Sequence, residues 1–123
     1  MILVDTSVWI RFLGGHEPYA TGLDDLLGRD DVAGHPMIYG ELLIGDRGRR
    51  AKLLAAYALM HQAPVVPHAE VVDFVRHHRL FGRGIGWIDV HLLASARVAG
   101  VHLWTADPRF AGAAEELRIA HRS

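Results

Sequence analysis

Met1-Ile2-Leu3-Val4-Asp5-Thr6-Ser7-Val8-Trp9-Ile10 opens the chain, and this stretch decides the fold. The apolar run 2–4 is typical of a short parallel strand that is buried on both faces. The three polar residues that follow it offer capping side chains, which predict that a helix begins directly after the strand. A strand that passes at once into a helix is the alternation from which α/β domains are built.

The rest of the chain continues this alternation. Short apolar runs indicate strands at 65–66 and 101–104, a weaker strand at 31–33 and an edge strand at 118–120. Between them, helical patterns occupy residues 18–27, 37–44, 49–61, 68–81 and 87–99. We therefore predict one domain over residues 1–123, an α/β three-layer sandwich whose mainly parallel sheet of four to five strands is flanked by helices. Ligands of such sheets bind outside the carboxyl ends of the strands.

Composition excludes several classes of protein. The chain has no cysteine, which rules out disulfides, cysteine–zinc sites and thiol nucleophiles and suits the cytoplasm. No apolar run approaches the roughly 20 residues of a membrane span, so neither a signal peptide nor a membrane anchor is expected. The formal net charge of −1 gives no broad basic field for nucleic acid. Arginine makes up 12 of the 13 basic residues, and its planar fork suits phosphate.

Four of the 14 acidic residues stand in apolar surroundings, where an unpaired carboxylate would cost several kcal/mol. Asp5 and Asp107 follow the strands at 2–4 and 101–104. Glu41 and Asp89 lie on the apolar stripes of two predicted helices, the faces that should meet the sheet. All four therefore point toward the carboxyl edge of the sheet.

Each placement also has a structural interpretation. Asp5 and Asp89 suit helix caps, Asp107 before Pro108 suits a turn, and Glu41 suits a pair with a buried arginine. Four carboxylates together, however, repel one another unless a cation compensates them, and Mg²⁺ or Mn²⁺ prefers a site made only of oxygen ligands. Such an ion favours phosphodiester hydrolysis, because it holds the phosphate and activates water.

The residues that carry these acids also resemble a known family. The start of the chain, the isolated Glu41, the run 86–96 (Gly-Trp-Ile-Asp-Val-His-Leu-Leu-Ala-Ser-Ala) and the run 103–110 (Leu-Trp-Thr-Ala-Asp-Pro-Arg-Phe) resemble PIN-domain ribonucleases. Within these, the sequence is similar to the VapC toxins of toxin–antitoxin pairs, in order and over nearly the whole chain. The resemblance implies a Rossmann-like sheet and an endoribonuclease that cuts tRNA, rRNA or mRNA and inhibits translation.

The resemblance also assigns roles and partners. It places the family's catalytic, metal-binding quartet on Asp5, Glu41, Asp89 and Asp107, with Asp5 and Asp89 as the first metal ligands. It implies a homodimer and a cognate VapB-type antitoxin whose tail blocks the site. The hydroxyls of Thr6 and Thr105 are candidates for contact with metal-bound water or substrate, and capping is their alternative role.

From the residues themselves, Arg83 and Arg109 are candidates for contacts with RNA phosphates, and solvated surface residues are the alternative. Two other functions stay open at this point. One is a catalytically silent PIN-like module that binds RNA or protein, against which the intact quartet argues. The other is a phosphatase of the haloacid dehalogenase type, whose chemistry needs an Asp two residues after Asp5, where this chain has Ser7.

Overall fold

Three short parallel strands form the centre of the molecule in a computed structural model, which describes residues 1–122. β1 (Ile2–Val4) lies between β2 (Val32–Ala33) and β3 (His102–Trp104), so the sheet order is β2-β1-β3. Both neighbours pair with β1 in parallel. The carboxyl ends of the strands therefore meet at one edge of the sheet, as the α/β prediction requires.

The sheet has fewer regular strands than the four to five that the sequence predicted. Within residues 1–122, two further positions join it only through single parallel bridges, Gly34 with Gln62 and Leu103 with Ala120. The bridge at Ala120 lies in the predicted edge strand 118–120, so that segment does follow β3, but for one pairing only.

The prediction of a strand at Val65-Val66 is wrong, and Gln62 takes the place beside β2 instead. Pro64 and Pro67 flank this pair and have no N–H to donate to a neighbouring strand, which prevents regular pairing here. Val66 still contributes to the core, whereas Val65 is exposed.

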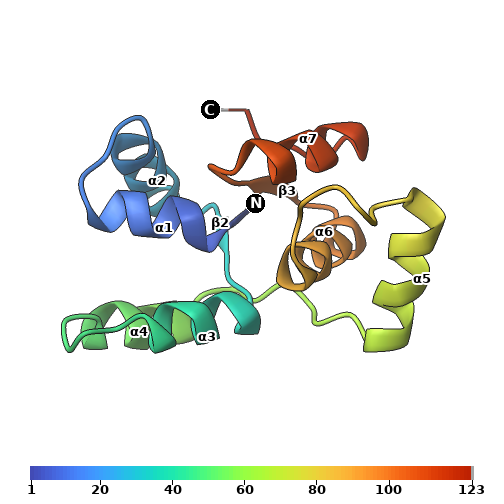
Figure 1. Cartoon of the computed structure of the whole chain (residues 1–123). Coiled ribbons are helices and arrows are strands. Elements are labelled where there is room, and N and C mark those ends of the chain that lie inside the picture. The colour runs from blue at the N-terminus through green and yellow to red at the C-terminus, as the bar shows by residue number, and fades with distance from the viewer. Residues whose placement is uncertain (123) are drawn as a thin grey trace.

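Seven helices cover the strands within the described chain. Figure 1 shows α1, α2 and α7 on one side of the strands, α3 and α4 on the opposite side, and α6 with α5 beyond β3. Their bounds are α1 (Thr6–Leu13), α2 (Tyr19–Gly28), α3 (Pro36–Ile44), α4 (Ala51–Ala58), α5 (His68–His78), α6 (Trp87–Ala99) and α7 (Pro108–Glu116). None of the helices in residues 1–122 is both long enough and apolar enough to cross a membrane.

α7 is a helix that the sequence analysis did not predict. Asp107, considered there as a turn residue, is its N-cap, and the Asp107 side chain accepts a hydrogen bond from the Arg109 N–H at 2.9 Å. Pro108 occupies the first turn, where its missing N–H costs nothing. The signals for this helix were present in the Asp-Pro pair and in the apolar residues Phe110, Ala113, Ala114 and Leu117, which have helical spacing, and the sequence analysis overlooked them.

His35 is the one fully buried imidazole in the described structure, and it holds the end of β2 to α6. Its Nδ1 accepts a hydrogen bond from the Met37 N–H (3.0 Å), and its Nε2 lies 3.0 Å from Ser95 Oγ. Its backbone N–H donates to the hydroxyl of Tyr57 (2.8 Å). Because Nδ1 acts as an acceptor, the ring is neutral and Nε2–H donates to Ser95. Burial, aided by the nearby His91, lowers the pKa of His35 to about 4.

We predict that His35 makes the protein less stable in acid. The unfolded chain binds a proton near pH 6.5 and the folded chain only near pH 4, so the free energy of unfolding should fall as the pH drops through this window, by about 3 kcal/mol from this residue. Urea unfolding at pH 7, 6, 5 and 4 measures the loss. His35→Asn, which can still cap α3, should be less stable at pH 7 but should show a smaller loss. An equal loss in both proteins would contradict the prediction.

Candidate active site

Asp5 lies at the carboxyl edge of the sheet, directly after β1. Its N–H donates to the Trp104 carbonyl (2.8 Å), which continues the pairing of β1 with β3 by one residue. Asp5 occupies the cap position of α1, but its side chain makes no capping bond and is buried, with 6% exposed. Asp5 Oδ2 instead accepts hydrogen bonds from the hydroxyls of Ser7 (2.7 Å) and Thr105 (2.8 Å). The carboxylate is therefore fixed between the ends of two strands.

Ser7 and Thr105 also hold the segment after β3. Ser7 Oγ accepts a hydrogen bond from the Ala106 N–H (3.0 Å), and Thr105 Oγ1 accepts one from the Asp107 N–H (3.1 Å). Each hydroxyl has a single proton, which it donates to Asp5, so the 3.2 Å approach of the two hydroxyls is a packing contact. The sequence analysis proposed Thr105 and missed Ser7. The available signal was a hydroxyl two residues after the first acid.

Glu41 reaches the same region from α3. Its side chain is half-buried, and its Oε1 accepts a hydrogen bond from the Thr6 hydroxyl at 2.7 Å. Thr6 is the first residue of α1, so this bond ties the start of α1 to the middle of α3. The alternative of a pair with a buried arginine is wrong, because the described residues contain no ion pair to Glu41.

Asp89 and Asp107 stand at the starts of two helices. Asp89 is the third residue of α6, and its Oδ2 accepts a hydrogen bond from the Gly86 N–H at 2.8 Å. Asp107 caps α7 through Oδ1. The structural interpretation of these two acids holds only in part, because Gly86 and not Asp89 is the N-cap of α6, and Asp107 caps a helix instead of starting a turn. The hydrogen bond at the helix start occupies only one oxygen of each carboxylate.

The electrostatics of Asp89 place all four acids in one neighbourhood. Burial raises its pKa, and the negative charges of Asp5, Asp107 and Glu41 raise it further, against the opposing hydrogen bond from the Gly86 N–H. A carboxylate whose proton affinity is increased by three others has uncompensated negative charge around it. Asp89 therefore lies within electrostatic range of the three other acids that the sequence singled out.

Each of the four carboxylates keeps one oxygen without a protein hydrogen bond in the described structure. The anchored oxygens are Asp5 Oδ2, Glu41 Oε1, Asp89 Oδ2 and Asp107 Oδ1. Their side chains do not converge closely enough for three of them to hold an ion as they stand, within residues 1–122. Their chemistry nevertheless fits Mg²⁺ or Mn²⁺, because the free donors are all carboxylate oxygens and no described cationic side chain pairs with them.

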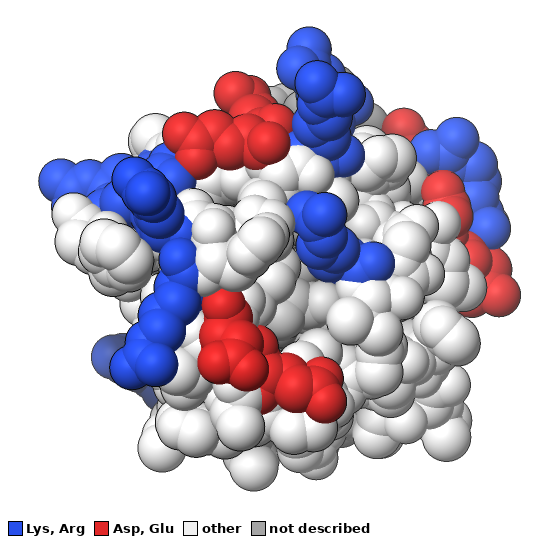
Figure 2. All heavy atoms as spheres, turned by 90° about the vertical axis from the view of Figure 1, so that its right-hand side faces the viewer, with Lys and Arg blue, Asp and Glu red and all other residues white. Residues whose placement is uncertain are grey.

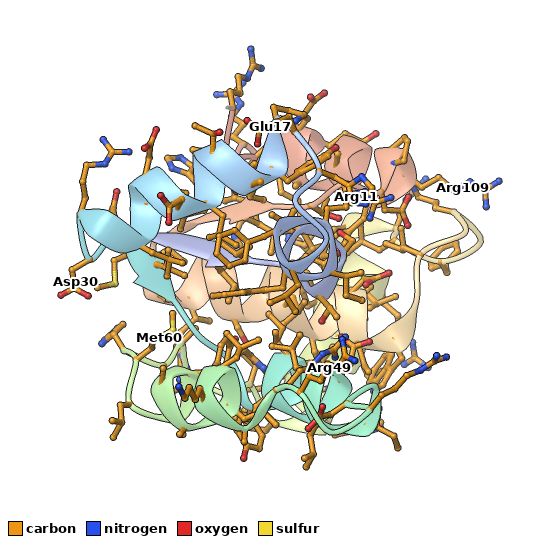
Figure 3. All side chains as sticks on the ribbon, turned by 90° about the vertical axis from the view of Figure 1, so that its left-hand side faces the viewer. Arg11, Glu17, Asp30, Arg49, Met60 and Arg109 are labelled. Atoms are coloured by element: carbon orange, nitrogen blue, oxygen red, sulfur yellow. The ribbon has the colours of Figure 1, made fainter. Side chains whose placement is uncertain are left out.

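The two candidate RNA contacts, Arg83 and Arg109, flank the start of α6. Arg83 forms an ion pair with Glu116 of α7. Arg109 lies against the backbone of Gly84, where an added Cβ would come within 2.5 Å of its Nη1. Gly84 has φ +75°, a left-handed conformation that glycine adopts readily. Figure 3 shows Arg109 pointing outward from the molecule beside this loop. Of the two, Arg109 is the one without a carboxylate partner in the described chain.

Comparisons with known proteins agree with this architecture. Residues 2–116 match the family model described as PIN domain. Ribonuclease VapC32 from Mycobacterium tuberculosis, in strains CDC 1551 / Oshkosh and ATCC 25618 / H37Rv, is 44% identical over 121 residues, which cover 98% of this chain and 95% of the relative. The crystal structure of PAE2754 from Pyrobaculum aerophilum has the same fold, with a TM-score of 0.58 and 16% identity over 94% of this chain and 90% of that one.

Removal of one charge from the cluster should stabilise the protein when no divalent cation is present. We predict that Asp89→Asn raises Tm at pH 7 in a chelator by about 1–4 °C, since it removes repulsion while an amide oxygen can still accept the Gly86 hydrogen bond. Because the folded-state pKa of Asp89 is raised, the penalty from its charge appears only as the pH rises through that pKa. The gain should therefore vanish below about pH 4, near the ordinary pKa of an aspartate.

Differential scanning fluorimetry at pH 3.5 and pH 7 measures this difference. Asp24→Asn is the matched control, because Asp24 is exposed on α2. A gain of the same size in both variants, or a gain at both pH values, would contradict the prediction.

Proposed function

The chain belongs to the PIN domain family and to its VapC group, and from this premise we propose that it is a metal-dependent endoribonuclease, the toxin of a toxin–antitoxin pair. The observation that supports this most is the set of four carboxylates at the carboxyl edge of the sheet, each with one oxygen anchored and one free. This arrangement orients the acids and leaves donors for a cation that binds phosphate. The related Ribonuclease VapC32 is, by its name, a ribonuclease.

The four acids have ranked roles in this proposal. Asp5 and Asp89 are the first ligands of Mg²⁺ or Mn²⁺, and Glu41 and Asp107 complete the site directly or through water. When bound, the ion supplies Lewis-acid stabilisation of the charge that develops on the phosphate. Ser7 fixes Asp5 through Oδ2, so Oδ1 is the atom that is presented to the ligand.

The reaction is hydrolysis of an RNA phosphodiester. Water attacks phosphorus in line with the departing 3′ oxygen, which leaves a 5′-phosphate and a 3′-hydroxyl. A free carboxylate oxygen of the cluster accepts a proton from the attacking water, and the departing 3′ oxygen takes up a proton from solvent. Thr6 and Thr105 act as positioning residues, because their protons are donated to Glu41 and Asp5.

The proposal includes two protein partners and a compartment. A second copy of the chain forms a homodimer, and a VapB-type antitoxin blocks the site until it is released. Large apolar side chains offer surface for such contacts, among them Ile44 (89% exposed), Leu59 (89%) and Phe81 (62%). The protein acts in the cytoplasm, where its RNA substrates and antitoxin are made.

We predict that Asp5→Asn lowers RNA cleavage at least about 100-fold, because even the loss of a residue that only orients a metal ligand commonly costs 10–100-fold. The assay incubates total cellular RNA with the purified protein and Mg²⁺ or Mn²⁺ and follows new 5′-phosphate ends. Asp24→Asn on α2 is the control and should cleave as the wild type does. Cleavage that needs no metal, or equal cleavage by Asp5→Asn, would contradict the nuclease proposal. Absence of cleavage would favour the catalytically silent module.

The hydroxyls on Asp5 should control metal affinity. We predict that Ser7→Ala and Thr105→Val each raise the Mn²⁺ concentration that gives half-maximal cleavage by about 10-fold, since Asp5 loses one of the two bonds that orient it. Saturating Mn²⁺ should restore most of the activity to both variants. A loss that saturating metal leaves unchanged would mean that the hydroxyls contact the substrate instead.

A further inference from the structure

The connection between α3 and α4 is held in one shape by Asp46. Its Oδ1 accepts three backbone hydrogen bonds, from the N–H groups of Gly48 (2.9 Å), Arg49 (2.9 Å) and Arg50 (3.0 Å). Gly48 has φ +98°, a conformation that side chains other than glycine rarely adopt. We call residues 46–50 the arginine loop, because three of its five residues are arginine.

The arginines of the loop have different surroundings. Arg50 is half-buried, and its Nη1 donates to the Leu42 carbonyl at 2.8 Å, so it satisfies the end of α3. Arg47 and Arg49 are exposed, and neither pairs with a carboxylate in the described part of the chain. The loop thus uses one arginine for its own structure and presents two cations to a ligand.

The arginine loop is joined to the acid site through α3. It follows α3, the helix that carries Glu41, after a single residue. In Figure 3, Arg49 lies between α1 and the layer of α3 and α4, whereas Asp30 lies at the far end of the molecule. One helix, α3, therefore carries the acid Glu41 and leads into a loop with two cations that have no carboxylate partner in the described chain. A ligand with one group bound at the acids and an anionic group next to it would contact both the carboxylates and the arginines.

We propose that Arg47 and Arg49 form a phosphate-binding subsite for a single strand of RNA whose scissile phosphate lies at the four acids. This inference rests on the proposed nuclease function and adds to it the residues that hold the neighbouring nucleotides. Phosphates repeat at every nucleotide, so a strand with one phosphate at the acids places another next to it. The planar arginine fork binds phosphate in a bidentate manner, which fixes the position of the strand.

The subsite is important because the overall charge of the chain does not attract RNA. The net charge of −1 offers no general attraction for RNA. Figure 2 shows basic and acidic side chains in small separate groups on the face that carries α5, α6 and α7. Affinity for the strand therefore depends on a few arginines in fixed places. Asp46 is a positioning residue, because its carboxylate contacts no substrate and determines the path of the backbone that carries Arg49.

The test is the salt dependence of RNA binding. The Asp5→Asn chain, in fixed Mg²⁺, is titrated against a fluorescently labelled single-stranded 12-nucleotide RNA of mixed sequence at several KCl concentrations. We expect Arg49→Gln to raise Kd several-fold at low salt and to lower the slope of log Kd against log salt by up to about 0.7, the contribution of one phosphate contact in a single strand. Asp46→Ala should reproduce part of both effects, and the double variant should bind about as weakly as Arg49→Gln alone, because Asp46 acts by positioning Arg49.

Arg29→Gln is the control, because Arg29 precedes β2 and so lies at the amino edge of the sheet, opposite the acids. A slope unchanged by Arg49→Gln, or lowered equally by Arg29→Gln, would overturn the subsite and leave the loop for contact with a protein. Cleavage by the wild-type chain is measured separately on the same RNA. Metal-dependent cleavage with unchanged slopes would sink only the subsite, whereas reduced slopes without any cleavage would sink only the nuclease proposal.

Discussion

The parallel pairing of β1 with β3 is the interaction on which the site depends. Val4 lies opposite Trp104, and the next N–H, that of Asp5, continues the ladder to the Trp104 carbonyl. This register brings Thr105 to the carboxylate of Asp5. A slip of one residue would turn every side chain of a strand to the opposite face of the sheet. All three residues of β1 are buried, as are Leu103 and Trp104 of β3, so packing on both faces of the sheet fixes this register and with it the geometry of the polar edge.

Helix starts supply the remaining acids and also restrain them. Asp89 and Asp107 each satisfy a backbone N–H that a helix start leaves without a partner, and the same bond orients the carboxylate. Burial raises the pKa of Asp89 most, and the negative charges of the other three acids raise it further, so mutual repulsion adds to the cost of placing these acids near one another without a cation. That cost makes the cluster selective for a ligand of positive charge, because a cation removes the repulsion and a neutral ligand does not.

The sequence predicted the α/β class, the parallel sheet and its central strands, because apolar runs and capping residues are local signals. It predicted too many regular strands, since the effect of Pro64 and Pro67 on pairing at Val65-Val66 depends on which neighbour lies beside them. The four acids were singled out as site candidates by their unusual placement in apolar sequence. The hydrogen bonds of Thr6 to Glu41 and of Thr105 to Asp5 were not predicted, because bonds between residues 35 and 100 positions apart leave no trace in local spacing. Ser7 was missed although it lies only two residues after Asp5.

The contrast between local sequence and the contacts made in the fold also explains why composition says little about the ligand. The net charge of −1 is a sum over the whole chain. It includes four carboxylates near the carboxyl edge of the sheet and arginines whose surroundings differ from one to the next. Arg50 binds a carbonyl, Arg83 binds Glu116, and Arg47 and Arg49 remain free in the described chain. Because salt screens charges beyond about 8–10 Å, a strand of RNA responds to the groups within its reach and hardly to the total. In the subsite that we propose, recognition of RNA therefore depends on which arginines the fold leaves unpaired.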